Sequence, residues 1–179
     1  SYMSSENIDL INNYYNYALK IYDGMTRMTG EEYICHSIRV AKILADLHMD
    51  TLTIGCALIH EAITLELATP EEIENKFGVD TLTILTSLSK LSHLKRTFTK
   101  NNNDADKYRR IVVGLSENPI SLFIKLADRL DEMQTKEYSE EEKKQIANET
   151  MNVLIPIAHR LGINSIKSKL EDLCLRYTK

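Results

Sequence analysis

The sequence is short of residues that interrupt helices, with six glycines and three prolines among 179 residues. Its hydrophobic fraction of 43% and charged fraction of 27% are ordinary for a globular protein, which excludes a disordered or collagen-like chain. No apolar run approaches the roughly 20 residues that a membrane-spanning helix needs. The N-terminus lacks the basic and apolar segments of a signal peptide. We therefore expect no contact with a membrane.

Cysteine and excess positive charge are also scarce. The three cysteines, Cys35, Cys56 and Cys174, are odd in number and show no Cys-x-x-Cys spacing, which argues against a disulfide framework. Cys35 and Cys56 lie in apolar stretches and are interpreted as buried thiols, so we expect a reducing, cytoplasmic location. The formal net charge of −4 disfavours a strongly basic nucleic-acid binder. Direct contact with nucleic acid is therefore not expected.

The length of the chain favours a single domain over residues 1–179. Nearly every segment has helical periodicity and none is a convincing strand, so we predict an all-α protein. The predicted helices cover residues 38–47, 52–65, 70–77, 80–91, 105–116, 120–133, 139–161 with a kink at Pro156, and 164–177. Capping boxes at Thr69 and Ser139 mark two of the starts. Residues 92–107 are polar and rich in turn formers, which predicts a mobile surface loop.

Two histidines and two acidic residues stand in otherwise apolar surroundings: His36, His60, Glu61 and Asp128. Imidazole and carboxylate groups are ligands for Mn, Fe or Zn. Burying such groups without partners is costly, and a shared metal ion would remove that cost. A salt bridge of Asp128 with Arg129 or Arg39, together with His60 as a hydrogen-bonded core histidine, would explain the same residues without a metal.

The order of these residues resembles the HD superfamily of metal-dependent phosphohydrolases. Four longer segments are similar to one branch of that superfamily: TGEEYICH at 29–36, IKLADRL at 124–130, PIAHRLGI at 156–163 and LEDLCLRY at 170–177. They resemble motifs of the hydrolase domain of Rel/Spo proteins, the bifunctional enzymes that make and degrade the alarmone (p)ppGpp in the stringent response. The resemblance runs from about residue 20 to the end of the chain.

The resemblance implies a bundle of roughly eight to ten helices and a role for each matched residue. The metal ligands would be His36, His60, Glu61 and Asp128, and the metal Mn²⁺. Arg27 matches a basic residue that lies against the guanine base, and Thr135 matches a position lining the pocket of a guanosine nucleotide such as ppGpp or GDP. Arg27 could equally be a solvated surface arginine. The chain is expected to be a fragment, with a synthetase domain of the same protein following residue 179.

The sequence departs from the family where the hydrolase acids should stand. The family motif His-Asp-x-x-Glu-Asp reads HEAITL at 60–65, so Thr64 and Leu65 replace the Glu-Asp pair that activates or orients the attacking water. Neither side chain can act as a carboxylate base, and loss of a general base typically costs about 10²–10⁴ in rate. Glu66 would face away from His60 if the predicted helix 52–65 continued past it.

A second departure lies after Asp128. The family motif DRLHNMRT reads DRLDEMQT at 128–135, so Glu132 replaces an asparagine and Gln134 an arginine. An added acid and a lost cation should weaken binding of a highly anionic nucleotide.

These departures lead to four hypotheses. The first is a degenerate Rel/Spo hydrolase domain, inactive or weak, that serves as a regulatory partner of the synthetase domain. The alternative is an active Mn-dependent ppGpp 3′-pyrophosphohydrolase with Glu66 or Glu132 as the base. A third is an HD hydrolase with another nucleotide substrate, and the last is a helical interaction module without metal.

Overall fold

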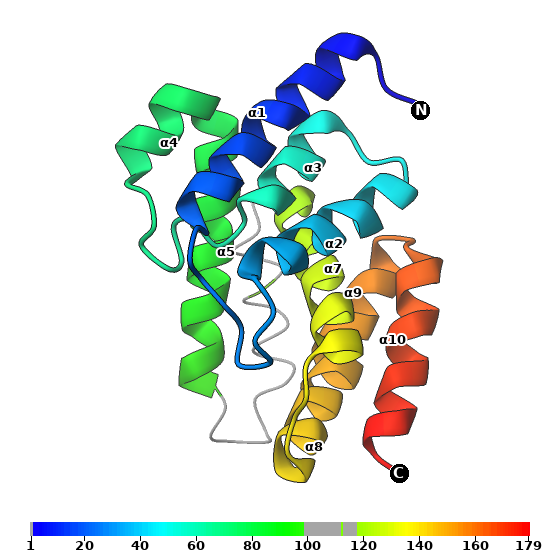
Figure 1. Ribbon diagram of the computed structural model, residues 1–179. Helices are drawn as coiled ribbons and strands as arrows, with labels where there is room; N and C mark the ends of the chain where they lie inside the picture. The colour runs from blue at the N-terminus through cyan, green and yellow to red at the C-terminus, as the bar shows by residue number, and fades with distance from the viewer. Residues whose placement is uncertain (1, 99–111, 113–117) are drawn as a thin grey trace.

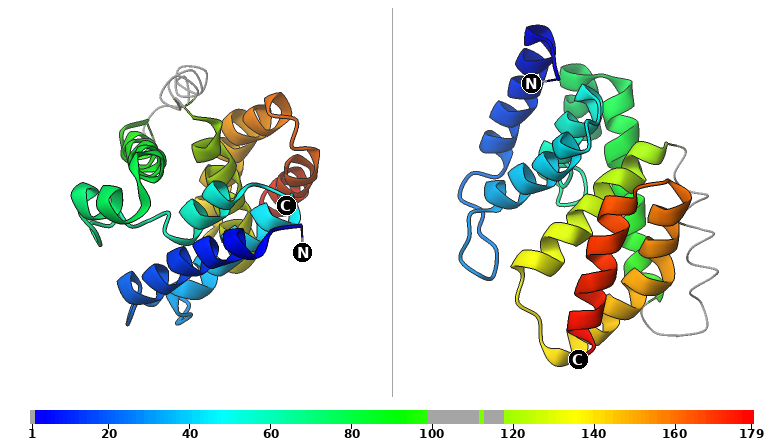
Figure 2. Two further views of the ribbon diagram at one scale, coloured as in Figure 1. Left: turned by 90° about the horizontal axis from the view of Figure 1, so that it is seen from above. Right: turned by 90° about the vertical axis from the view of Figure 1, so that its right-hand side faces the viewer.

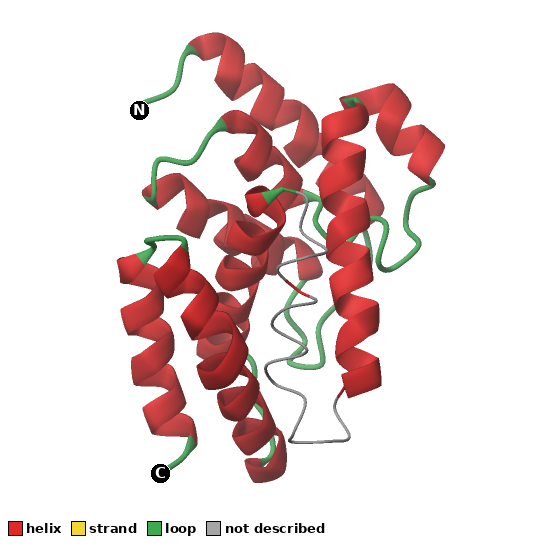
Figure 3. Cartoon of the chain, turned by 180° about the vertical axis from the view of Figure 1, so that it is seen from behind, coloured by secondary structure: helices red, strands yellow, loops and turns green. Residues whose placement is uncertain are grey.

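The computed structural model describes residues 2–98, 112 and 118–179, and every regular element in these ranges is a helix (Figure 1, Figure 3). The elements are α1 (Ser5–Ile21), α2 (Tyr33–Asp46), α3 (Thr51–Leu58), α4 (Pro70–Phe77), α5 (Val79–Phe98), α7 (Pro119–Thr135), α8 (Glu140–Glu149), the π-helical turn η2 (Thr150–Leu154), α9 (Ile155–Arg160) and α10 (Asn164–Tyr177). An isolated bridge pairs Thr26 with Glu32. The predicted all-α class is confirmed. No helix in the described ranges is both long and apolar enough to span a membrane.

Helices α4 and α8 begin at the predicted capping residues. Ser139 Oγ accepts a hydrogen bond from Glu142 N at 3.3 Å, and the Glu142 carboxylate accepts one from Ser139 N at 2.8 Å. Thr69 Oγ1 likewise accepts from Glu72 N at 3.1 Å. The Glu72 carboxylate, however, accepts a hydrogen bond from the Tyr17 hydroxyl at 2.9 Å. The acid of this second box therefore ties α4 to α1.

The predicted helix 52–65 is wrong in its second half, because α3 ends at Leu58 and residues 59–66 form consecutive turns. In a continuing helix the Ala57 carbonyl would accept from the amide of Glu61. Here that carbonyl lies 2.7 Å from His60 Nδ1, and Glu61 N donates to the Tyr22 hydroxyl at 3.2 Å. The His60 side chain thus competes with the Glu61 amide for the Ala57 carbonyl, which helps to end the helix.

Three further boundaries differ from the prediction. Helix α2 begins at Tyr33, five residues before the predicted start at 38. Helix α5 continues to Phe98, so residues 92–98 of the predicted loop are helical. The rest of that loop and the predicted helix 105–116 lie outside the described residues, except Val112. The predicted helix 139–161 is interrupted by η2, which ends two residues before Pro156. Proline lacks an amide proton for the preceding turn, and a wider π turn accommodates that loss.

Helix α7 is the central element and contributes to two hydrophobic clusters. Ile124 and Ala127 pack into the cluster formed with α1 to α5, whereas Leu122, Leu126 and Leu130 pack into the cluster formed with α8 to α10. These positions lie on different sides of the helix because of its 3.6-residue period. Helix α2 packs on both α3 and α7 (Figure 1, Figure 2). The polar residues of α2 and α7 are therefore brought together in the interior.

Candidate metal centre

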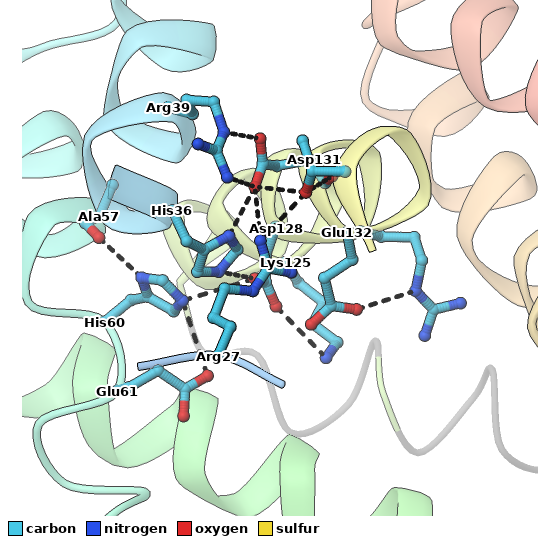
Figure 4. Close-up of polar contacts among 12 residues, drawn as sticks. Arg27, His36, Arg39, Ala57, His60, Glu61, Lys125, Asp128, Asp131 and Glu132 are labelled. Atoms are coloured by element: carbon cyan, nitrogen blue, oxygen red, sulfur yellow. Dashed lines mark hydrogen bonds and ion pairs between the residues drawn. The ribbon is translucent and has the colours of Figure 1, made fainter. Parts of the chain in front are cut away.

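Three side chains from distant parts of the chain converge on one point. His36 is on α2, His60 lies two residues after the end of α3, and Asp128 is on α7 (Figure 4). One ligand atom from each lies within 4.8 Å of the others. Asp128 Oδ1 is 2.9 Å from His36 Nε2 and 3.5 Å from His60 Nε2. All three side chains are buried.

The second nitrogen of each histidine is already committed to another acceptor. His60 Nδ1 lies 2.7 Å from the Ala57 carbonyl, and a carbonyl only accepts, so this nitrogen carries the proton. His36 Nδ1 lies 2.6 Å from Asp131 Oδ2 and donates in the same way. Both Nε2 atoms therefore face Asp128 Oδ1. Such outer hydrogen bonds fix the orientation of histidine ligands in metal sites.

The facing atoms fit a cation. Within the described part of the chain, His60 Nε2 and Asp128 Oδ1 are buried without a hydrogen bond of acceptable geometry. Buried polar atoms in proteins are almost always partnered, and leaving one unpaired is unfavourable. Two imidazole nitrogens and a carboxylate oxygen around a shared point are suitable ligands for a borderline divalent metal. The donor set therefore fits such an ion.

A proton on His36 balances the charge when no metal is bound. Burial alone would lower the pKa of His36, but its close contacts with the Asp128 and Asp131 carboxylates outweigh burial and raise that pKa to about 9. Burial would raise the pKa of Asp128, yet its contacts with the two histidines hold it well below its usual range. The metal-free site at neutral pH is therefore an imidazolium paired with carboxylates.

Glu61, the fourth predicted ligand, lies beside this group of three. Its Oε1 atom is 3.6 Å from His60 Nε2, and the triad within 4.8 Å does not include it. Burial is the largest cause of a raised pKa at Glu61, and the charge of Asp128 raises it further. Lys125 Nζ lies 4.0 Å from Asp128 Oδ2 at the same edge of the site.

The salt bridges suggested as an alternative for Asp128 are not observed. The Arg39 guanidinium binds Asp131 and Glu31 instead. Arg129 is buried on the other side of α7, where its NH1 donates to Thr150 Oγ1 at 2.8 Å. His60 is indeed a core histidine with a hydrogen bond, but only at Nδ1. The alternative therefore leaves the contact of His60 Nε2 with Asp128 unexplained.

Arg27 and Thr135, the predicted nucleotide-binding pair, contact each other although they are 108 residues apart. Arg27 NH1 donates to Thr135 Oγ1 at 3.0 Å and to Glu31 Oε1 at 3.2 Å. The same nitrogen is 3.8 Å from Asp131 Oδ2. The Arg27 side chain is largely buried, so the interpretation as a solvated surface arginine is wrong.

The sequence did not indicate Glu31 and Asp131 as neighbours of this pair, and it suggested Asp128 rather than Asp131 as a partner of Arg39. Arg39 Nε lies 2.7 Å from Asp131 Oδ1, and the Arg39 guanidinium also makes contacts of 2.8 and 2.7 Å with Glu31. Arg39 follows His36 by three positions, so both lie on the same face of α2. That spacing was the one signal in the sequence for a contact near the site.

The positions of the missing acid pair lie in the turns after α3. Thr64 is half-buried and Leu65 is 43% exposed. Glu66 is exposed and adopts a left-handed backbone with φ of 55°. It does not continue a helix, so the argument that it faces away from His60 on a continuous helix does not apply. Glu132 Oε2 lies 3.9 Å from Arg129 Nε, and 28% of its side chain is exposed. Figure 4 shows Glu132 on α7 near the convergent ligands.

Comparison with known proteins adds sequence and fold relatives. A family model described as an HD domain matches residues 15–164. The chain is 35% identical over 181 residues to a GTP pyrophosphokinase from Myxococcus xanthus, covering 99% of this chain and 24% of the relative. It is 38% identical over 164 residues to a guanosine-3′,5′-bis(diphosphate) 3′-pyrophosphohydrolase from Aquifex aeolicus, covering 91% and 23%. The chain thus spans about a quarter of these curated relatives.

A solved structure shares the fold. It is described as a metazoan ortholog of SpoT that hydrolyzes ppGpp, and it matches with a TM-score of 0.70 over 98% of this chain and 97% of that chain. Sequence identity between the two is 20%, so the match concerns the arrangement of helices.

Proposed function

Because the chain belongs to the HD-domain family and its relatives are Rel/Spo enzymes, we propose that it is a degenerate (p)ppGpp hydrolase domain. In this proposal it binds a divalent metal and a guanosine nucleotide but hydrolyses the nucleotide weakly or not at all. It acts as a regulatory domain for a synthetase domain that follows residue 179 in the same cytoplasmic protein. The coverage of about a quarter of each relative is consistent with such an arrangement.

The metal in this proposal is Mn²⁺, held by His36, His60 and Asp128 with Glu61 beside them. A bound divalent ion would supply Lewis-acid polarisation of a phosphoryl oxygen and would lower the pKa of water. The protein contributes fixed ligand orientations through the Ala57 carbonyl and the helices that carry the other two ligands. Glu61 is one methylene longer than the aspartate of the family motif, and its Oε1 atom lies 3.6 Å from His60 Nε2.

The observation that carries the proposal is the composition of the turns 59–66. Thr64 and Leu65 occupy the positions of the acid pair, so no carboxylate stands there to accept a proton from water. Loss of a general base costs about 10²–10⁴ in rate even when the other groups remain. The ligands and the base positions are separate residues, so one set can persist without the other.

The contacts of Arg27 with carboxylates of the protein support weak binding of a highly charged nucleotide. The Arg27 guanidinium already bonds Glu31 and lies near Asp131, so its positive charge is largely compensated. Glu132 adds a further negative charge to the face of α7 near the ligands. An anionic nucleotide must compete with these carboxylates for Arg27. Binding of GDP or ppGpp for regulation therefore requires Arg27 to exchange partners.

An active Mn-dependent 3′-pyrophosphohydrolase is the second candidate, and one observation favours it. Glu132 follows Asp128 by four residues on α7, a spacing that puts both on one face of the helix, and 28% of its side chain is exposed. A carboxylate in that position could replace the lost base. Glu66, the other candidate base, is exposed in the turns after α3.

A turnover assay with the chain in excess over ppGpp separates the two candidates. The unsubstituted chain and Glu132→Gln are incubated with Mn²⁺, and nucleotides are separated by anion exchange. We expect ppGpp to be recovered almost intact from both. Rapid release of GDP and pyrophosphate by the unsubstituted chain, abolished by Glu132→Gln, would support the second candidate and contradict the first.

A further inference from the structure

The His36 ring lies between two carboxylates of the same helix. Asp128 Oδ1 is 2.9 Å from Nε2, and Asp131 Oδ2 is 2.6 Å from Nδ1. The two aspartates are three residues apart on α7, a spacing that places both on one face of the helix. Figure 4 shows the imidazole between them. Asp131 is 1% exposed, so its charge is screened little by solvent.

We propose that Asp131 is a positioning residue for the metal centre. It holds the ring proton of His36 on Nδ1 and so presents the lone pair of Nε2 to the ion. Its negative charge also strengthens the imidazole as a ligand. This inference rests on the proposed function, because it concerns the metal that His36 would bind, and it deepens that function by assigning a residue outside the ligand set.

The orientation of Asp131 is fixed by its other partners. Arg39 Nε contacts Oδ1 at 2.7 Å, and Arg39 NH2 contacts Oδ2 at 3.2 Å, so the guanidinium engages both oxygens. Glu31 holds the opposite side of Arg39 through two further contacts. Thr135 Oγ1 lies 3.4 Å from Asp131 Oδ2. A carboxylate held on both oxygens cannot rotate away from His36 without breaking this network.

The two histidines provide an internal comparison. His60 donates from Nδ1 to the neutral Ala57 carbonyl, whereas His36 donates to a carboxylate. The backbone carbonyl fixes an orientation but adds no full charge. Removing Asp131 should therefore affect His36 alone and leave the orientation of His60 unchanged.

The test is the Mn²⁺ affinity of the metal-free 179-residue chain, measured from the electron paramagnetic resonance signal of the free ion. For Asp131→Ala we expect affinity to fall about 10- to 100-fold, as for other outer partners of metal ligands. Asp131→Asn should lose less, because its amide oxygen still accepts from His36 Nδ1. Asp172→Ala is the matched control: it removes the carboxylate of an exposed aspartate on α10, outside this network, and should bind Mn²⁺ as the unsubstituted chain does.

A spectroscopic readout separates positioning from a general loss of structure. In the Zn²⁺-loaded chain, long-range ¹H–¹⁵N spectra should show His36 with its proton on Nδ1 and its Nε2 bound to metal. In Asp131→Ala the His36 pattern should change while that of His60 stays. Should Asp131→Ala fail to fold by circular dichroism, Asp131→Asn provides both measurements.

The outcomes distinguish the inference from the proposed function. Equal Mn²⁺ affinity and an unchanged His36 pattern in a folded Asp131 variant would overturn the role of Asp131 alone. Absence of divalent metal from the unsubstituted chain would overturn both ideas. Rapid ppGpp hydrolysis by the unsubstituted chain would contradict only the loss of activity and would leave the role of Asp131 standing if the affinity falls as expected.

Discussion

The convergent ligands and residues 64–65 of the adjoining turns differ in what they retain. His36 and Asp128 are buried on the packed helices α2 and α7, and their ligand atoms meet those of His60. Thr64 and Leu65 lie in irregular, partly exposed turns and carry no carboxylate. In the proposed function, metal binding and water activation depend on different residues of one site. The proposal therefore separates a ligand set that is present from a base that is absent.

The largest expected effect comes from restoring the acid pair. The double variant Thr64→Glu, Leu65→Asp should raise the rate of ppGpp hydrolysis with Mn²⁺ by about 10²-fold or more, because a general base typically contributes 10²–10⁴. The matched control is Thr64→Gln, Leu65→Asn, which has nearly the same size without charge. If the acidic variant binds Mn²⁺ and nucleotide but gains no activity over the amide variant, the turns are not what limits catalysis.

Removing one of the convergent ligands should strongly lower the Mn²⁺ affinity. Asp128→Asn keeps the shape of the side chain but loses the charge that faces both histidines, so Mn²⁺ affinity should fall by more than about 100-fold, beyond the loss typical of outer partners. Isothermal titration calorimetry on the metal-free chain measures this. Asp172→Asn makes the same change at an exposed position on α10 and should have no effect. Undiminished affinity in Asp128→Asn would place the ion elsewhere.

The turns after α3 were harder to predict from the sequence than the starts of α4 and α8. The helix starts at Thr69 and Ser139 follow from local capping chemistry, and the structure confirms them. The end of α3 was not predictable, because the apolar run continues past Leu58 without glycine or proline. Besides the His60 side chain, the Tyr22 hydroxyl takes part in ending the helix, because it accepts from the Glu61 amide across 39 residues. Tertiary contacts therefore decided the form of the turns.

The surroundings of the ligands show the same limit. The sequence indicated His36, His60 and Asp128 as ligands, and the structure brings their ligand atoms together. It gave no sign that Asp131 accepts from His36, since the pair is separated by 95 residues and meets only where α2 packs on α7. Residue type suggests which groups can bind a metal, whereas their outer partners depend on how helices pack.

The pH dependence of Mn²⁺ affinity should show whether His36 releases a proton when the metal binds. The metal must displace a proton from His36, whose pKa in the metal-free chain is about 9, so Mn²⁺ affinity should rise about tenfold per pH unit from pH 7 towards 9. The metal-free chain should show the opposite trend in stability. Because the folded pKa exceeds the ordinary value of 6.5, the stabilisation is full below pH 6.5 and is lost as pH rises through about 9.

Calorimetric titrations at several pH values, with chemical unfolding of the metal-free chain in parallel, measure both trends. A Mn²⁺ affinity that stays constant between pH 7 and 9 would show that His36 does not release a proton on binding.

The smallest expected effect concerns the cap of α8, which is away from the ligands and shows how the chain responds to a small loss of stability. Ser139→Ala removes the side-chain cap of α8 and should lower the free energy of unfolding by about 1 kcal/mol. Urea denaturation measures this change. Mn²⁺ affinity should not move, because α8 carries none of the ligands. A parallel loss of affinity would mean that the ligand cluster responds to general destabilisation, and the ligand variants would then need correction for it.

The most direct test of the central claim is to quantify bound Mn²⁺ and ppGpp turnover on the same sample of the unsubstituted chain. After loading and removal of free metal, elemental analysis gives the metal per chain and anion exchange gives the products. We expect close to one bound ion per chain with almost no conversion of ppGpp to GDP and pyrophosphate. Turnover at the rate of an active hydrolase domain, or a chain without metal, would contradict the claim that the ligands have outlasted the chemistry.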